Sequence, residues 1–223
     1  MTRSSNARIA GAAFLVYIAA GIASLVVMGR ASTGRDVAER LAQIAAHPTD
    51  IAVVVLLGLV QPFCALILGI TLYAITRDED ADIALFGLIC RTAEGILGAL
   101  AVPATLAVQS LALANVADAG ASHALATYLL RNDATFTATF FAVGSTAFAW
   151  LLLRGRMIPV LLGRVGVFAS IVLVIALPLV LAGWLRGVIT SLVWLPMLAF
   201  EVPLAIFLLA DRPRRTPVDR RSG

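Results

Sequence analysis

The feature that most constrains this chain is a series of six apolar windows, each long enough to cross a membrane as one helix. A helix needs about 20 residues to cross roughly 30 Å of hydrocarbon at a rise of 1.5 Å per residue. The windows predict spans at residues 9–28, 51–76, 83–108, 134–153, 160–182 and 188–210. Composition agrees, because 61% of the 223 residues are hydrophobic, against roughly 45–50% in soluble domains. We therefore predict an all-α polytopic membrane protein, a bundle of six transmembrane helices.

The first window resembles a signal peptide, since Arg3 and Arg8 precede it and small residues follow it. Its apolar core is too long for a signal peptide, and five further windows come after it. We therefore expect a retained helix. The domain organisation that follows is one transmembrane domain over residues 1–210 and a disordered, basic, cytoplasmic tail over residues 211–223.

The arginines predict the orientation, because cytoplasmic flanks of membrane spans keep an excess of positive charge. All 17 basic residues are arginines, and Arg91 lies inside a span. With the N-terminus inside, five of the rest lie outside: Arg30, Arg35, Arg40, Arg131 and Arg186. The other eleven lie on the cytoplasmic side: Arg3, Arg8, Arg77, Arg154, Arg156, Arg164, Arg212, Arg214, Arg215, Arg220 and Arg221. We therefore expect both termini in the cytoplasm.

Two outer segments are long enough to carry short helices. In residues 33–47, Thr33 and Asp36 have the spacing of a capping box, and three apolar residues follow at helical spacing: Val37, Leu41 and Ile44. In residues 109–133, Ser122 is the expected N-cap, and one face carries Leu125, Tyr128 and Leu129. Each helix is expected to be either a cover over the outer end of the bundle or a connector.

Prolines interrupt the hydrogen-bond ladder in four of the predicted spans: Pro62, Pro103, Pro178, Pro196 and Pro203. The carbonyls that a proline frees can line a cavity. Proline is also common in membrane helices that only pack. We favour the packing interpretation.

Ionisable residues occur inside the third and sixth spans. The stretch ICRTAEGIL carries Arg91 and Glu94, and the last span carries Glu201. Such a side chain near the bilayer centre costs about 2.5–3.5 kcal/mol on insertion scales unless it is paired or hydrated. Arg91 and Glu94 are three residues apart, so they share one helical face and can pair. Counted from the helix ends, Glu201 lies at a similar depth, and we expect it to face the pair across the bundle.

Polar residues of other spans fall at a comparable depth, namely Tyr17, Gln61, Ser145 and Ser170. The candidate ligand-binding or proton-binding residues are accordingly Arg91, Glu94, Glu201, Tyr17, Gln61 and Ser145. Burial disfavours the ionisation of two carboxyls beside one guanidinium. We therefore expect Glu201 to be protonated or to meet a cation; a purely structural hydrogen bond is the alternative.

No motif in the sequence predicts a cofactor, a metal site or a nucleic-acid partner. Zinc-ligand spacing, a P-loop, GxSxG and the dinucleotide glycine fingerprint are all missing from the sequence. The two histidines, His47 and His123, fall on separate outer segments. The predicted partner is the lipid bilayer, with a small molecule or a proton as the candidate ligand.

Four stretches together resemble one known family: ARIAGAAFLVYIAAGI, CRTAEGILGAL, FFAVGSTAFAWLLLRGRMIPVLLGRVGVFA and FEVPLAIFLL. They are similar to the bacterial multi-pass family catalogued as domain of unknown function 4386, over nearly the whole chain. Its best markers match Arg91 and Glu94, the turn from Arg154 to Pro159, and Glu201. The resemblance implies six helices and an inner-membrane location, and it implies no established activity. Members often carry a histidine in the fourth span, where this chain has Gly144, Ser145 or Thr146.

The sequence leaves three classes of function. The leading hypothesis is a transporter or sensor that binds a small ligand or a proton at the buried Arg91, Glu94 and Glu201 cluster. The second is a structural or accessory protein, in which these charges only fix helix packing. An intramembrane enzyme is the least favoured. Space for water at the cluster would favour binding, and dry packing would favour the structural alternative.

Overall fold

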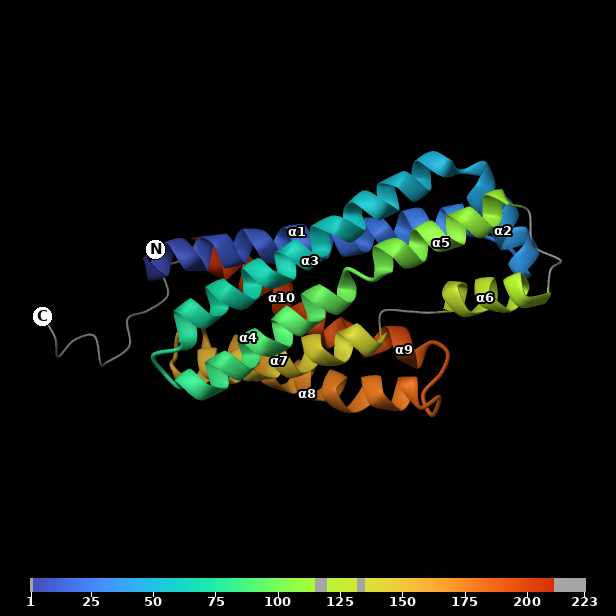
Figure 1. Ribbon diagram of the computed structural model, residues 1–223. Helices are drawn as coiled ribbons and strands as arrows, with labels where there is room; N and C mark the ends of the chain where they lie inside the picture. Colours follow the sequence, from blue (N-terminus) through green and yellow to red (C-terminus); the bar gives the residue numbers. More distant parts are fainter. Residues whose placement is uncertain (1, 115–119, 132–134, 211–223) are drawn as a thin grey trace, which may run out of the picture. The chain divides into compact units, whose positions relative to one another are not determined.

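The computed structural model describes residues 2–114, 120–131 and 135–210, and throughout these ranges the regular elements are helices (Figure 1). In chain order they are α1 (Arg3–Ala31), α2 (Val37–Ala46), α3 (Pro48–Thr76), α4 (Ala81–Gly98), α5 (Ala101–Leu113), α6 (Gly120–Arg131), α7 (Thr135–Arg154), α8 (Val160–Leu181), α9 (Ile189–Leu192) and α10 (Leu195–Ala210). The predicted all-α class is confirmed. The tail predicted over residues 211–223 lies outside the described residues.

Six segments of the described chain are long and apolar enough to cross a membrane, as predicted: Arg3–Ala31, Pro48–Thr76, Ala81–Leu113, Gly120–Arg154, Val160–Leu181 and Ile189–Ala210. Large apolar side chains on these helices stay exposed, such as Leu25 at 75% and Leu161 at 77%. Exposure of this kind suits side chains that face lipid. The chain is a multi-pass membrane protein.

Two predicted spans are interrupted where a continuous helix was expected. The third consists of α4 and α5, which are separated at residues 99 and 100. Pro103 explains this break, because its ring clashes with the carbonyl four residues earlier, on Ala99, and it has no N–H to donate there. The sixth consists of the four-residue α9 and of α10, in which Pro196 occupies the first turn, where proline is tolerated. Pro62 and Pro203 lie inside continuous helices.

The chain forms two compact units, which are described separately. Unit 1 comprises Met1–Val16, Cys64–Gly95 and Thr135–Gly223, and unit 2 comprises Tyr17–Phe63 and Ile96–Ala134. In unit 1, α8 packs against both α7 and α10. Close packing is possible because glycine occupies the contact points. A Cβ on Gly166 of α8 would overlap the Phe200 ring of α10, and one on Gly11 of α1 would lie 2.7 Å from the Ala205 carbonyl oxygen.

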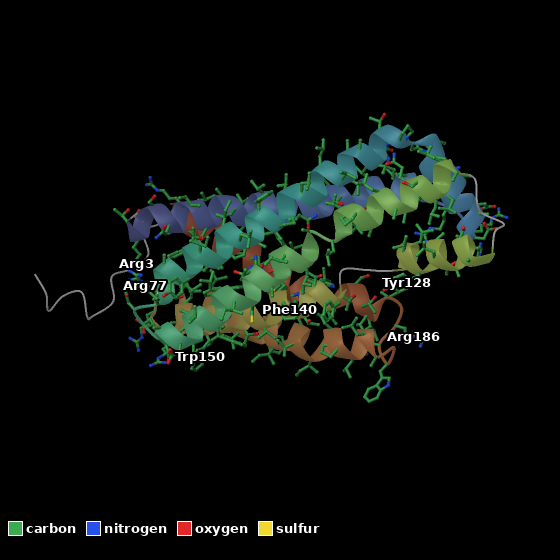
Figure 2. All side chains as sticks on the ribbon, viewed as in Figure 1. Arg3, Arg77, Tyr128, Phe140, Trp150 and Arg186 are labelled. Atoms are coloured by element: carbon green, nitrogen blue, oxygen red, sulfur yellow. The ribbon has the colours of Figure 1, made fainter. Side chains whose placement is uncertain are left out.

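Arg3, Arg77 and Arg154 of unit 1 lie at one end, which is called the arginine-rich end below. Figure 2 shows Arg3 and Arg77 at this end, together with Trp150, and Arg186 at the opposite end. The turns here are tied together, because Arg154 Nη1 lies 3.4 Å from Asp80 Oδ2 and Arg3 Nη2 donates to Met157 Sδ at 2.9 Å. The acidic turn between α3 and α4 is therefore linked to the end of α7.

Unit 2 has its own apolar core between α2, α5 and α6. Its buried members are Ala31, Leu41, Ile44, Ile51, Val108, Ala112 and Ala126. The N-cap of α2 is Asp36, whose carboxylate accepts from the Glu39 amide at 2.8 Å, so the capping box predicted from Thr33 was placed three residues too early.

The second outer helix, α6, also exists but differs in detail from the prediction. It begins at Gly120, so Ser122 lies inside the helix and is not its N-cap. The predicted apolar face is only partly correct. Leu129 packs on the core of unit 2, whereas Leu125 and Tyr128 are 48% and 66% exposed.

Candidate functional site, a buried charge cluster

The centre of unit 1 contains the ion pair that the sequence predicts. Arg91 Nη1 lies 2.9 Å from Glu94 Oε2, one helical turn along α4. The two residues are 1% and 3% exposed. A buried pair at this distance offsets much of the desolvation penalty that either charge would carry alone.

Two glycines allow the stem of Arg91 to be buried between helices. A Cβ on Gly69 of α3 would lie 3.0 Å from Arg91 Cβ, and a Cβ on Gly144 of α7 would lie 3.4 Å from Arg91 Cδ. A Cβ on Gly144 would also lie 3.1 Å from Cys90 Cβ, so a larger residue at either position would crowd α4. The sequence therefore leaves room for a long basic side chain inside an apolar bundle.

The head of Arg91 lies on an aromatic ring. Its Cζ is 5.1 Å from the centroid of Phe141, which is 3% exposed on α7. The Phe141 ring in turn contacts Trp194, with centroids 6.0 Å apart and planes tilted by 36°. A guanidinium over an aromatic face gains about 0.5–2 kcal/mol, more when it is desolvated.

Glu201 is the second buried acid of unit 1, on α10 and 6% exposed. Among the residues that the structure describes, Glu201 forms no ion pair, and its buried Oε1 has no hydrogen-bond partner. The ion-pair partner of Arg91 is Glu94 on the same helix, as the spacing predicts. The geometric reason is proximity, because the i,i+3 spacing brings Glu94 to Arg91 with no change in helix packing.

Arg91 and Glu201 nevertheless border the same small cavity, of about 10 Å³. Side chains of five helices line it: Phe14, Leu72, Arg91, Ser145, Phe148, Ala149, Leu152, Phe200, Glu201 and Leu204. A cavity of this size holds about one water molecule, provided that polar groups are within reach. Here the polar groups are a guanidinium, a carboxyl and the Ser145 hydroxyl.

The structure brings together part of the predicted set. Arg91, Ser145 and Glu201 line the cavity, and Glu94 pairs with Arg91. Ser170 is fully buried, and its hydroxyl donates to the Gly166 carbonyl of its own helix at 2.8 Å. Its hydrogen bond therefore stays within α8. The other two predicted residues, Tyr17 and Gln61, belong to unit 2, where both are half-buried.

Sequence reasoning missed the aromatic side chains of the site. Phe14, Phe148 and Phe200 line the cavity, and Phe141 carries the guanidinium. A signal for two of them was present in α7. The positions 141, 145, 148 and 152 follow helical spacing, so the face that holds Ser145 also holds Phe141 and Phe148. A comparable signal was present for Phe200 of α10, because the buried positions 197, 200, 201 and 204 follow helical spacing.

The cluster offers a buried carboxyl beside a water-sized cavity. Within the described ranges, no group of three or more His, Cys, Asp or Glu side chains is placed to hold a metal ion. The charges sum to one positive and two negative when both acids are ionised. A carboxyl that faces one water-sized space in an apolar wall can exchange a proton with that water.

Comparison with known proteins gives one match. A search of the curated proteins and a search of the solved structures each found no matching protein. The family described as Domain of unknown function (DUF4386) matches residues 9–211, which is nearly the whole chain and includes Arg91, Glu94 and Glu201. By this match, and with six apolar helices around a buried charge cluster, the chain belongs to the DUF4386 family of multi-pass membrane proteins.

Proposed function

We propose that this protein binds a proton at Glu201, inside the membrane, as part of a transport or sensing cycle. One observation carries the proposal: a carboxyl that is 94% buried has an oxygen without a hydrogen-bond partner in the described part of the chain, and it faces a water-sized cavity. An ionised carboxylate left this way in an apolar bundle costs several kcal/mol. Protonation removes that cost.

Charge balance supports a proton as the ligand. Glu94 neutralises Arg91 at 2.9 Å, so one full negative charge remains when Glu201 ionises. A single added proton makes the buried cluster neutral. Buried carboxyls of this kind in membrane proteins commonly mark proton relays.

The size of the cavity argues against an organic ligand in this conformation. Sites for small molecules usually have volumes of about 300–1,000 Å³. The cavity beside Glu201 is about 10 Å³, because Phe14, Phe148 and Phe200 fill the space around it. A proton, delivered through a single water molecule, is the ligand class that fits.

A structural role is the second candidate, and the packing of Arg91 favours it. The stem of this residue is enclosed by Gly69 and Gly144, and its charge is matched within its own helix. The same features would serve a protein in which the pair only sets the register of α3, α4 and α7. Glu201 separates the candidates, since helix register does not need a second, unpaired acid.

For the orientation, we propose that the arginine-rich end of unit 1 lies in the cytoplasm of a bacterial inner membrane. Arg3, Arg77 and Arg154 are at this end, and Arg186 is at the other, which matches the positive-inside rule. Labelling Asp78→Cys and Arg186→Cys in intact cells, in a chain lacking Cys64 and Cys90, tests it. An impermeant thiol reagent should modify only the cysteine at position 186.

The proton proposal is tested by infrared spectroscopy of the protein in lipid vesicles. The wild type should show the C=O band of a protonated carboxyl at neutral pH, and Glu201→Gln should lack it. Asp78→Asn is the matched control, because this acid is 63% exposed beside Arg77, and its band pattern should equal that of the wild type. An identical spectrum for wild type and Glu201→Gln at neutral pH would reject the proposal.

A further inference from the structure

We propose that Phe141 is a positioning residue that holds Arg91 on Glu94 and thereby leaves Glu201 available to a proton. This role rests on the proposed function and explains what keeps Glu201 free to bind the proton. The Arg91 guanidinium has two buried acids near it, Glu94 and Glu201, and these two acids compete for it.

Arg91 has a choice of partners. It forms an ion pair with Glu94 at 2.9 Å, and it borders the same cavity as Glu201. An arginine side chain has several rotatable bonds, and both possible partners are carboxyls. The chemical nature of the partner therefore does not determine which of the two Arg91 pairs with. The surroundings of the guanidinium must decide.

Phe141 favours the pairing of Arg91 with Glu94. Its ring centre is 5.1 Å from Arg91 Cζ, within the range of a cation–π contact. The ring is itself buried and rests on Trp194, at 6.0 Å between centroids. A guanidinium on this ring is kept at one place, and from that place it reaches Glu94.

The stem of Arg91 is restrained as well. Gly144 lies three residues after Phe141 on α7, and a Cβ there would lie 3.4 Å from Arg91 Cδ. A Cβ on Gly69 of α3 would lie 3.0 Å from Arg91 Cβ. Both the guanidinium and the stem of Arg91 therefore lie against α7. The same face of α7 continues to Ser145, which borders the cavity.

Few other charges act on Glu201. Among the residues that the structure describes, Arg91 and Glu94 of α4 are the charged side chains that act on it, and the cavity walls from α1, α3 and α7 carry no charge. Cys64 of α3 and Cys90 of α4 are buried thiols near Arg91. The position of Arg91 therefore decides whether Glu201 meets a proton or a guanidinium, since both compete for one carboxylate.

The test uses Phe141→Leu in lipid vesicles, with Phe141→Tyr as the conservative variant. Leucine keeps the apolar volume but removes the π face, so Arg91 can turn to Glu201 and displace the proton. We expect the Glu201-dependent C=O band at neutral pH to fall at least threefold in Phe141→Leu and to persist in Phe141→Tyr. Circular dichroism and the Tm show whether each variant is folded.

A second variant keeps the test decisive if Phe141→Leu does not fold. Phe141→Met also removes the π face and fills the space with a flexible apolar side chain, so Arg91 should again turn to Glu201, with the same loss of the band. A full band in folded Phe141→Leu, or in folded Phe141→Met, would overturn the positioning role. If the wild type has no Glu201-dependent band, the proposed function fails instead, so the two failures are distinguishable.

Discussion

At the scale of single residues, glycine decides how closely the helices of unit 1 approach. Gly166→Ala should destabilise the protein by about 1–3 kcal/mol, because the added Cβ overlaps the buried Phe200 ring. Gly29→Ala is the matched control, since an added Cβ there meets nothing within 4 Å in a helix, and it should stabilise by up to about 1 kcal/mol. Thermal unfolding in detergent, followed by circular dichroism, measures both. Equal Tm values for the two variants would contradict this account of the packing.

The ion pair also makes a prediction at this scale. Arg91→Met leaves buried acids without a cation and should cost about 3–5 kcal/mol. The double variant Arg91→Met with Glu94→Leu should be more stable than Arg91→Met alone, because it removes an acid that has lost its partner. Denaturant unfolding of both variants checks this order. A double variant that is less stable than Arg91→Met would show that Glu94 has another essential partner.

How much of the site follows from sequence depends on how local each contact is. The Arg91 and Glu94 pair follows from spacing on one helix, and it was predicted. Whether Glu201 touches Arg91 depends on how α10 packs, and the sequence left this open; in the structure both side chains line one cavity. How closely Phe200 approaches α8 could not have been predicted, because it depends on Gly166 of that helix.

At the scale of elements, the break between α4 and α5 is a product of one proline. Pro103→Ala restores an N–H for the Ala99 carbonyl and removes the ring clash, so α4 and α5 should join into one helix. Hydrogen exchange of the peptide over residues 97–106 should then slow by about tenfold or more. Pro203→Ala in the continuous α10 is the control, and it should leave this peptide unchanged. Unchanged exchange in Pro103→Ala would mean that tertiary contacts cause the break.

Sequence predicted the elements well where the cause is local and less well where it is not. The six apolar segments follow from composition over about 20 residues, and all six are present. The amphipathic α2 was predicted from Val37, Leu41 and Ile44, of which Leu41 and Ile44 are buried. Its cap was misplaced because Thr33 and Asp36 offer overlapping signals, and Asp36 forms the bond. The gap between α9 and α10 could also have been marked from sequence, because Pro196 lies four residues after Leu192, the last residue of α9, and cannot donate to its carbonyl.

At the scale of the whole molecule, the apolar surroundings of the spanning helices are what disfavour an ionised Glu201. Apolar side chains cover the spanning helices, and the few buried charges of unit 1 gather beside one water-sized cavity. The chain belongs to a family of multi-pass membrane proteins, and the property to be tested is proton binding at Glu201. A protein of this kind would link its conformation to the protonation of one acid.

The central claim is that Glu201 binds a proton inside the bilayer. Infrared spectra of wild type, Glu201→Gln and Glu201→Asp in vesicles at neutral pH test it most directly. The account predicts a protonated-carboxyl band in the wild type, its loss in Glu201→Gln, and a shifted band of similar size in Glu201→Asp, which keeps the acid on a shorter side chain. A band that is equally strong in all three proteins would contradict the claim, because the protonated carboxyl would then be another residue.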